Sequence, residues 1–356
     1  MIFRLMLLIT SVVRSNALAE SDRLHEYEIR NHTWPPLPEE YIPNTEGWRS
    51  LIRRRLEQVE SIPDISDRYN GYMKTIYTGL IAPNFTEHGW GLTRVPEELI
   101  SELRANLQIG LKDPDKYFSY ENVGVNILEF EEKEESHARP LFYWQEELNK
   151  KVLHDLLPLH QAWAGVELVP NNAYGLRIYR NSSNLLMHID KMQTHIISGI
   201  LHVDHDPESK PWPLVIEDFN GNVNEVILTP GDLLLYESSK CIHGRPHHFN
   251  GSYYTSVFLH YYPKTWDAKR VESETHYRVP PQWKEANTRK SQEELVIIKT
   301  SVKEPECLHG WCSLKGSTRY NGPADEGFII SSEGKEKIVY TEIGVDTSGS
   351  SGSDEL

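Results

Sequence analysis

A run of short apolar segments separated by turn formers extends over residues 174–263 and limits the chain to few folds. Asn220-Gly221, Pro230-Gly231 and Asn250-Gly251 are pairs that favour tight turns. Short strands that follow one another without a long helix between them are typical of a β-sandwich or barrel. The strands predicted in this run are 174–180, 185–190, 194–202, 213–216, 225–228, 233–237 and 253–262.

Two polar residues, His188 and Asp190, stand two positions apart in the second of these strands. Side chains two positions apart in a strand point to the same face, so the pair is able to hold one ion. A third ligand must come from a strand that is distant in sequence, and His243 is the candidate. Two imidazoles and one carboxylate on one face of a metal leave three coordination positions open. Non-haem iron(II) oxygenases use this arrangement to bind a cosubstrate and oxygen.

Other histidines compete with this assignment. His202 and Asp204 form a second pair of the same spacing, but a polar, proline-containing loop follows them directly. We therefore expect these two side chains at a strand end, in water. His195, His247 and His248 are interpreted as strand or loop histidines, any of which could line a site without binding metal.

The segment from Tyr174 to Tyr262 resembles the double-stranded β-helix of the 2-oxoglutarate and iron(II)-dependent dioxygenases, within them the prolyl 4-hydroxylase-like branch. Pro230-Gly-Asp232 with the apolar strand after it is similar to the hairpin that precedes the distal histidine in that family. The resemblance implies His188, Asp190 and His243 as iron ligands and 2-oxoglutarate as cosubstrate. It also implies that Tyr179 contacts the cosubstrate.

One feature departs from the family pattern, which has an arginine or lysine nine or ten residues after the distal histidine. Here those positions are Ser252 and Tyr253. A buried dianion needs a cationic partner. Arg245 is the candidate, because it lies two residues beyond His243 and would face the same side. Ser252 and Tyr254 would add hydroxyl donors. The alternative is a solvated Arg245 that caps a turn.

The formal charge of −15 and a pI near 5.5 argue against nucleic acid as the partner. They favour a neutral or basic polypeptide over an acidic one.

The two termini carry address-like sequences. Residues 1–19 resemble a secretory signal peptide, with Arg4 before an apolar run that is too short to span a bilayer. No later stretch is apolar enough to be a membrane span. The flexible tail 347–356 ends in Ser-Asp-Glu-Leu, which is close to the retention signal read by an endoplasmic-reticulum receptor. We therefore expect the lumen of the endoplasmic reticulum.

Acceptor sequons and cysteines agree with that compartment. Cys307 and Cys312 are close enough for a local disulfide, and Cys241 is left over as a buried thiol, either structural or beside the metal. Four asparagines begin acceptor sequons for glycosylation: Asn31, Asn84, Asn181 and Asn250.

The remaining segments frame the predicted core 174–263. Residues 20–44 are expected to form an extended N-terminal arm, and 45–263 the dioxygenase domain. Helices are predicted over 45–62, 96–111 and 140–164, whereas 67–93 receives no assignment. The C-terminal extension 264–346 has no predicted role; 264–294 is expected to be irregular and 295–302 to form a strand. The predicted fold class is mixed α and β, a jelly-roll or cupin-like core with N-terminal helices.

We expect a lumenal oxygenase that uses O2, iron(II) and 2-oxoglutarate to hydroxylate a residue of secretory polypeptides. Proline is the first candidate for the hydroxylated residue. The family implies dependence on ascorbate. Trp212 and Tyr236 would line the substrate groove. Two alternatives are a hydroxylase of another residue or small molecule on the same scaffold, and a non-catalytic cupin-like binding protein.

Overall fold

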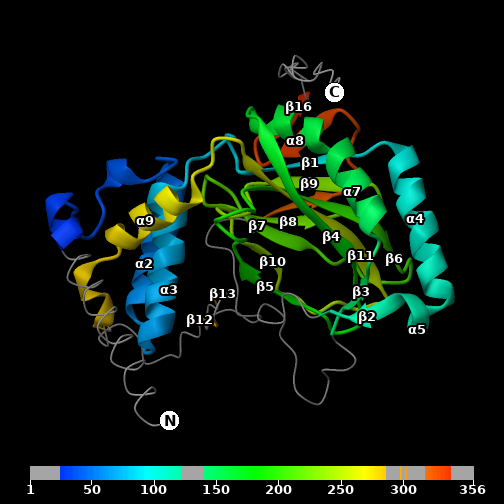
Figure 1. The fold of residues 1–356 in the computed structure, drawn as a ribbon, viewed down its shortest axis with the longest axis horizontal. Coiled ribbons are helices and arrows are strands. Elements are labelled where there is room, and N and C mark those ends of the chain that lie inside the picture. Colours follow the sequence, from blue (N-terminus) through cyan, green and yellow to red (C-terminus); the bar gives the residue numbers. More distant parts are fainter. Residues whose placement is uncertain (1–24, 122–138, 286–296, 299–300, 303–316, 338–356) are drawn as a thin grey trace, which may run out of the picture.

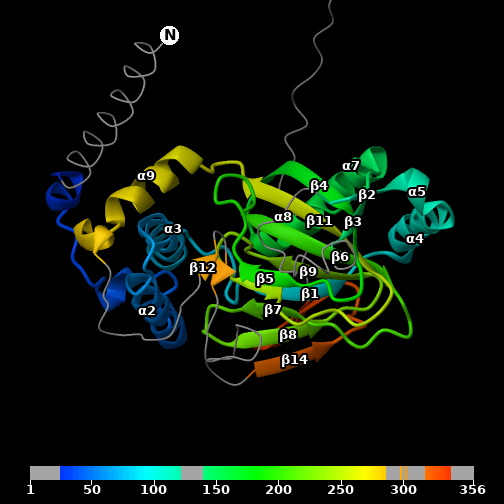
Figure 2. The same ribbon diagram turned by 90° about the horizontal axis from the view of Figure 1, so that it is seen from below.

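Two large β-sheets form the centre of the protein, and helices pack on two sides of them (Figures 1 and 2). The computed structural model describes residues 25–121, 139–285, 297–298, 301–302 and 317–337. The nine-stranded sheet has the order β16-β15-β1-β9-β6-β11-β4-β3-β2, and the seven-stranded sheet has the order β12-β13-β5-β10-β7-β8-β14. Neighbouring strands are antiparallel, apart from β14, which pairs with β8 in parallel. Mixed α and β structure with large antiparallel sheets is thus confirmed.

From β4 to β11 the chain passes repeatedly from one sheet to the other. The nine-stranded sheet contains β1 (Trp90–Arg94), β2 (Phe118–Tyr120), β3 (Leu141–Tyr143), β4 (Leu168–Tyr179), β6 (Ile197–His205), β9 (Asp232–Tyr236), β11 (Tyr254–Pro263), β15 (Phe328–Ser331) and β16 (Gly334–Lys337). The seven-stranded sheet contains β5 (Leu185–His188), β7 (Leu214–Glu217), β8 (Val223–Ile227), β10 (His243–Arg245), β12 (Ile297–Ile298), β13 (Ser301–Val302) and β14 (Ser317–Asn321).

Two groups of helices cover the sheets. One group comprises α2 (Glu46–Glu60), α3 (Ile65–Ile76) and α9 (Ala268–Arg278), and the other comprises α4 (Glu97–Lys112), α5 (Pro114–Tyr117), α7 (Glu146–Asp155) and α8 (Leu157–Ala164). The two groups lie at opposite sides of the molecule (Figure 1). Three shorter turns of helix are Pro38–Glu40, Tyr77–Ile81 and Pro281–Lys284.

Each group of helices completes a separate part of the core. Alternation along the strands sends one set of side chains between the sheets and the other set outward. Ile200 and Leu234 point into the first cluster, which also contains Trp48 of α2. Leu201 and Leu233, one position along, point into the second cluster, against Leu103 of α4 and Val152 of α7.

The predicted helices at 45–62 and 96–111 are present as α2 and α4. α2 begins as the sequence indicates, because the Thr45 hydroxyl accepts a hydrogen bond from the Trp48 backbone N–H at 3.1 Å. The seven predicted core strands are found as β4, β5, β6, β7, β8, β9 and β11, with ends shifted by a few residues.

The prediction of one helix over 140–164 is wrong. Leu141–Tyr143 is strand β3, and two helices, α7 and α8, follow it. Pro158 explains the division, because its ring and missing N–H are tolerated in the first turn of α8 but not within a helix. Trp144, which lies between β3 and α7, is 59% exposed.

The prediction of an irregular segment over 264–294 is also wrong, because α9 occupies half of the part that is described. Asp267 caps it, accepting a hydrogen bond from the Arg270 backbone N–H at 3.0 Å. The unassigned stretch 67–93 contains most of α3 together with β1.

Both ends of the described chain pack on the main body. In the predicted extended arm, Tyr41 is buried in the first core cluster. The C-terminal extension contributes β14 beside β8 and β15 beside β1. Residues 1–24 and 338–356, which carry the predicted signal peptide and retention signal, lie outside the described residues. Among the described helices, none has the length and apolar character needed to cross a membrane.

Candidate metal centre and its pocket

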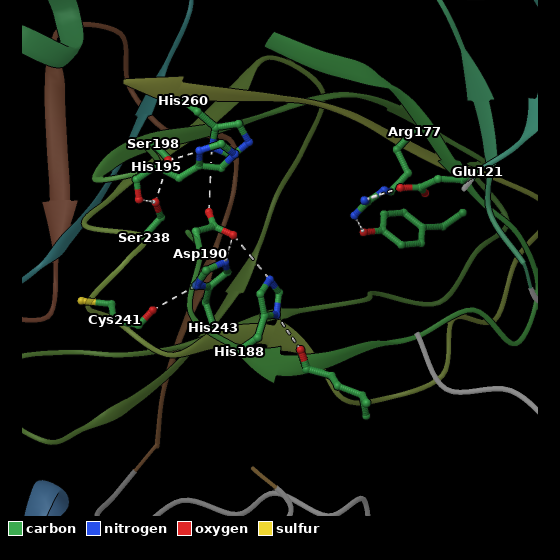
Figure 3. A network of polar contacts seen from close by, with 12 residues as sticks. Glu121, Arg177, His188, Asp190, His195, Ser198, Ser238, Cys241, His243 and His260 are labelled. Atoms are coloured by element: carbon green, nitrogen blue, oxygen red, sulfur yellow. Dashed lines mark hydrogen bonds and ion pairs between the residues drawn. The ribbon is translucent and has the colours of Figure 1, made fainter. Parts of the chain in front are cut away.

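Strand pairing brings His188 and His243 together. His243 on β10 is the direct register partner of His188 at the end of β5, and Asp190 lies two residues further along. The Asp190 Oδ1 atom is 3.7 Å from His188 Nε2 and 4.0 Å from His243 Nε2. The three side chains converge on one point (Figure 3). The sheet therefore assembles the three ligands that the sequence suggests.

Backbone carbonyls fix the orientation of both imidazoles. His188 Nδ1 is 2.7 Å from the Leu186 carbonyl oxygen, and His243 Nδ1 is 2.9 Å from the Cys241 carbonyl oxygen. A carbonyl only accepts, so each Nδ1 carries the proton and donates it. Each Nε2 then keeps its lone pair free toward Asp190. Hydrogen bonds of this kind, from the ring nitrogen that does not face the metal, orient the histidine ligands of metals.

Burial and the close contacts determine the protonation states. Burial alone would raise the pKa of Asp190, but its contact with His188 and the nearby His243 and His260 hold that pKa well below its usual range. Burial, with a contribution from His188, lowers the pKa of His243 to about 4. At neutral pH the site thus presents a carboxylate and a neutral imidazole, which are the forms that bind metal.

The residues present fit a divalent transition metal. One ligand atom from each of His188, Asp190 and His243 lies within 4.8 Å of the other two. Asp190 Oδ2 is buried and has no hydrogen-bond partner among the described residues, which is a costly arrangement without a cation. Two nitrogens and one oxygen on one side suit iron(II) with open positions opposite.

The open side of the cluster faces a pocket of about 490 Å³. Its floor includes Tyr236, whose ring contacts His243 with centroids 4.6 Å apart. Both apolar and polar side chains line the pocket. In addition to the three candidate ligands, they are Asn171, Asn172, Tyr174, Arg177, Leu185, Ile189, Lys191, Thr194, His195, Ile200, Tyr236, Phe258 and His260.

A buried ion pair forms one wall of the pocket. Arg177 Nη2 donates to Glu121 Oε1 at 2.5 Å, and Tyr174 donates to the same oxygen at 2.8 Å. Both charged groups are almost fully buried. Arg177 lies over the Phe258 ring at 4.8 Å and also donates to the Tyr179 hydroxyl. Burial opposes the charged form, but Glu121 holds the pKa of Arg177 above its usual value.

The arginine that lines the pocket is Arg177, whereas the sequence suggests Arg245. Arg245 is buried and donates to the Trp212 carbonyl oxygen at 2.5 Å and to the Tyr254 hydroxyl at 2.9 Å. Its guanidinium lies 4.5 Å from the centroids of both of these rings. The alternative of a solvated turn cap does not describe it either. Ser252 is exposed and donates to Asp206.

The two aromatic residues that were predicted to line the substrate groove, Trp212 and Tyr236, lie in different parts of the structure. Tyr236 lines the pocket, whereas Trp212 lies in the core, where its ring contacts Tyr179, Phe249 and Tyr254. Tyr179 is buried and contacts the pocket through Arg177.

The competing pair, His202 and Asp204, is not part of the cluster formed by His188, Asp190 and His243. His202 is buried rather than in water, because Tyr254 stacks on it and its Nδ1 donates to the Thr255 carbonyl oxygen at 3.0 Å. Asp204 forms an ion pair with Arg104 at 3.1 Å. The expected location in water is thus wrong for His202, because β6 extends to His205 and carries it into the interior.

A second layer behind Asp190 was not identified from the sequence. His260 Nδ1 lies 3.8 Å from Asp190 Oδ2 and 2.9 Å from the Ser198 hydroxyl. Ser198 in turn contacts the Ser238 hydroxyl at 2.6 Å, and His195 stacks on His260. The alternation of β11 gives a signal, since His260 lies two positions from Phe258, which lines the same pocket.

Cys241 is buried, and its thiol lies 3.5 Å from the Gly89 carbonyl oxygen, on the side away from the cluster (Figure 3). Burial raises the pKa of this thiol. It is a structural thiol, one of the two alternatives left open by the sequence. Cys307 and Cys312 lie outside the described residues. All four sequon asparagines, Asn31, Asn84, Asn181 and Asn250, are exposed.

Comparison with known proteins gives matches among solved structures. No protein-family model matches the sequence, and neither does any curated protein. A prolyl-4-hydroxylase from Pseudomonas putida is 14% identical, with a TM-score of 0.36 over 55% of this chain and 99% of that one. A prolyl hydroxylase from Trichoplax adhaerens, solved with a hypoxia inducible factor peptide fragment, is 12% identical, with a TM-score of 0.39 over 58% and 93%.

HygX from Streptomyces hygroscopicus, solved with nickel and 2-oxoglutarate, is 10% identical, with a TM-score of 0.37 over 51% of this chain and 85% of that one. The solved structures to which the chain is similar thus include prolyl hydroxylases and a protein that binds 2-oxoglutarate.

Proposed function

We propose that this protein is an iron(II)- and 2-oxoglutarate-dependent oxygenase that hydroxylates a residue of a polypeptide, with proline as the first candidate. One observation carries the proposal: two imidazole nitrogens and a carboxylate oxygen converge from His188, His243 and Asp190, and their open side faces a pocket.

We further infer that the two sheets form a double-stranded β-helix. In chain order, β4, β6, β9 and β11 belong to the nine-stranded sheet, and β5, β7, β8 and β10 belong to the other. The chain therefore crosses repeatedly between sheets, as it must when it winds around a common interior. The candidate ligands lie on the neighbouring strands β5 and β10 and just beyond β5.

Three side chains would hold the iron, and together with 2-oxoglutarate and O2 the metal would supply the oxidation of an unactivated C–H bond. The chain's own contribution is positioning. The Leu186 and Cys241 carbonyls hold both imidazoles in the tautomer that leaves Nε2 free. Ile200, Tyr236 and Phe258 line the space in front of the cluster with largely apolar surface.

Arg177 is our candidate partner for the far carboxylate of 2-oxoglutarate. It is a guanidinium that lines the same pocket as the cluster, whereas Arg245 is engaged by Trp212 and Tyr254. A guanidinium suits a carboxylate because it donates two parallel hydrogen bonds. Glu121 now accepts from Arg177, so a bound dicarboxylate would compete with this side chain.

The polypeptide substrate and the lumenal location are also proposals. Asn171, Asn172 and Lys191 place amide and ammonium groups at the pocket, and such groups bind the carbonyls of a peptide backbone. The signal-like sequence 1–19 and the terminal Ser-Asp-Glu-Leu support the endoplasmic reticulum and its retention receptor. Dependence on ascorbate is proposed from the resemblance alone.

The deciding experiment measures succinate release by the purified protein with iron(II), 2-oxoglutarate, ascorbate and a panel of proline-rich peptides. We expect turnover that a peptide stimulates and that Asp190→Ala abolishes. Turnover that only a small molecule stimulates would favour another hydroxylase on the same scaffold. A protein that neither binds iron(II) nor releases succinate would be a binding protein, and the proposal would be wrong.

A further inference from the structure

A second group of potential metal ligands lies away from the pocket. Glu87 and His88 are in the loop that leads into β1, and Glu333 is in the turn between β15 and β16. One ligand atom from each of the three residues lies within 4.8 Å of the other two. The group therefore joins the C-terminal hairpin to a segment more than 200 residues earlier in the chain.

The imidazole of His88 is the unusual member of this group. His88 is 7% exposed, and its Nδ1 atom is buried with no hydrogen-bond partner among the described residues. The nearest carboxylate oxygen in an ion-pair geometry is Glu333 Oε1, at 4.0 Å. Leaving a buried polar nitrogen without a partner is unfavourable, so a group that binds it would remove a penalty.

The backbone holds His88 in place. Its carbonyl oxygen accepts a hydrogen bond from the Phe219 N–H at 3.2 Å, and the next carbonyl, of Gly89, accepts one from the Glu237 N–H at 2.8 Å. The imidazole is thus presented from a fixed loop rather than from a free surface segment. Such a fixed first ligand reduces the entropy lost when an ion binds.

The two carboxylates supply adaptable ligands. Glu87 and Glu333 are exposed, so their side chains can rotate to bring their oxygens from within 4.8 Å of the other ligand atoms to the roughly 3.4 Å that separates ligand atoms in a tetrahedral site. Asn220 Nδ2 donates to Glu333 Oε1 at 2.9 Å and orients it.

We propose that Glu87, His88 and Glu333 form a binding site for a divalent transition-metal ion, with Zn²⁺ as the best match. Imidazole nitrogen with carboxylate oxygens is a donor set that zinc accepts in tetrahedral geometry, whereas Ca²⁺ takes oxygen ligands. This site is separate from the His188, Asp190 and His243 cluster and does not depend on the proposed oxygenase activity.

Such an ion would secure the C-terminal hairpin. β15 pairs with β1 at a single position, Leu92 with Ile330, and one isolated bridge joins Arg94 to Glu326. A ligand contributed by the turn of the hairpin adds a further attachment at its far end. We therefore expect bound Zn²⁺ to reduce the opening of residues 328–337.

Zinc binding by the full chain tests the proposal. We expect His88→Gln and Glu333→Gln each to bind one equivalent of Zn²⁺ less than the wild type, measured by equilibrium dialysis and elemental analysis. Glu336→Gln is the matched control, because it removes the same charge from an exposed position of the same hairpin. Differences between variants are decisive, since other histidines also bind zinc.

Hydrogen exchange gives a second readout. Zn²⁺ should slow exchange of the 328–337 amides at least several-fold in the wild type and in Glu336→Gln, and leave it unchanged in Glu333→Gln. Because Glu333 is exposed, its replacement does not threaten folding. Equal zinc binding by Glu333→Gln and Glu336→Gln, or equal protection of their hairpins, would overturn the proposal.

Discussion

Arg177 on β4 and Glu121, directly after β2, form a buried ion pair in the wall of the pocket that faces the three candidate metal ligands. The pair leaves two atoms, Arg177 Nε and Glu121 Oε2, buried without hydrogen-bond partners among the described residues. A buried pair that is incompletely satisfied gains little net stability. It is therefore suited to exchange one carboxylate for another.

The first prediction concerns this exchange. Glu121→Gln removes the internal competitor and leaves the Arg177 guanidinium in place, so we expect 2-oxoglutarate to bind about tenfold more tightly. Arg177→Met should weaken binding by a hundredfold or more, because the dianion loses its cation. Isothermal titration with 2-oxoglutarate and a redox-inert metal such as Mn²⁺ measures both effects without turnover.

A matched control for Glu121→Gln is Glu147→Gln, which removes the same charge from an exposed position of α7. Its affinity for 2-oxoglutarate should equal that of the wild type. If Arg245→Met weakens binding and Arg177→Met does not, the carboxylate partner is Arg245, and the role of Glu121 as a competitor is wrong.

The second prediction concerns the metal. Asp190→Ala and His243→Ala should each lower the affinity for iron(II) by at least a hundredfold, because each removes one of three ligands. His195→Ala is the control, since His195 lines the same pocket but is not part of the cluster. Anaerobic equilibrium dialysis measures the bound iron. A wild-type affinity in Asp190→Ala would place the metal elsewhere.

The sequence predicts the central strands and suggests the three ligands for a physical reason. Period-2 alternation places His188 and Asp190 on one face, and the apolar segments around them are long enough to be recognised as strands. That His243 lies opposite His188 is a matter of register between distant strands, and no local pattern carries that information.

Arg177 could have been found from the sequence, but Glu121 could not. Arg177 lies two positions before Tyr179, the residue expected to contact the cosubstrate, so alternation places both on one face. Glu121 reaches Arg177 because β2 and β3 extend the sheet beyond β4, and three-residue strands give almost no periodic signal. β16 was missed for a related reason, since all four of its residues are exposed.

The third prediction concerns the contact between α2 and the seven-stranded sheet. Arg55 Nη2 donates to Glu217 Oε1 of β7 at 2.7 Å, and both side chains are almost fully buried. Arg55→Met should lower the free energy of unfolding by about 3–5 kcal/mol, because Glu217 keeps its buried charge and loses this partner. Arg53→Met, on the exposed side of the same helix, should cost less than about 1 kcal/mol.

Urea unfolding at constant pH measures both variants. The double variant Arg55→Met with Glu217→Gln should recover much of the loss, because a neutral amide then replaces the buried carboxylate. Equal stability of Arg55→Met and Arg53→Met would show that the buried pair contributes nothing beyond a surface arginine.

The last prediction concerns acid sensitivity, for which His160 of α8 is the clearest source outside the pocket. Its Nδ1 donates to the Leu156 carbonyl oxygen at 2.7 Å, and its ring contacts Tyr261. Burial lowers the pKa of His160 to about 4. The unfolded chain, with an ordinary pKa near 6.5, therefore binds more protons between these two values, and stability is lost as the pH falls through that window.

This single group should cost roughly 2 kcal/mol of folding free energy between pH 7.5 and pH 5. His160→Asn keeps a donor for the Leu156 carbonyl but cannot titrate. Between pH 7.5 and pH 5 its free energy of unfolding should therefore decrease by roughly 2 kcal/mol less than that of the wild type. The exposed His154→Asn, from the neighbouring helix α7, should keep the wild-type slope. Urea titrations at the two pH values give the slopes. Parallel slopes for the wild type and His160→Asn would mean that His160 is protonated in the folded protein, and that its surroundings open in acid before the rest of the domain unfolds.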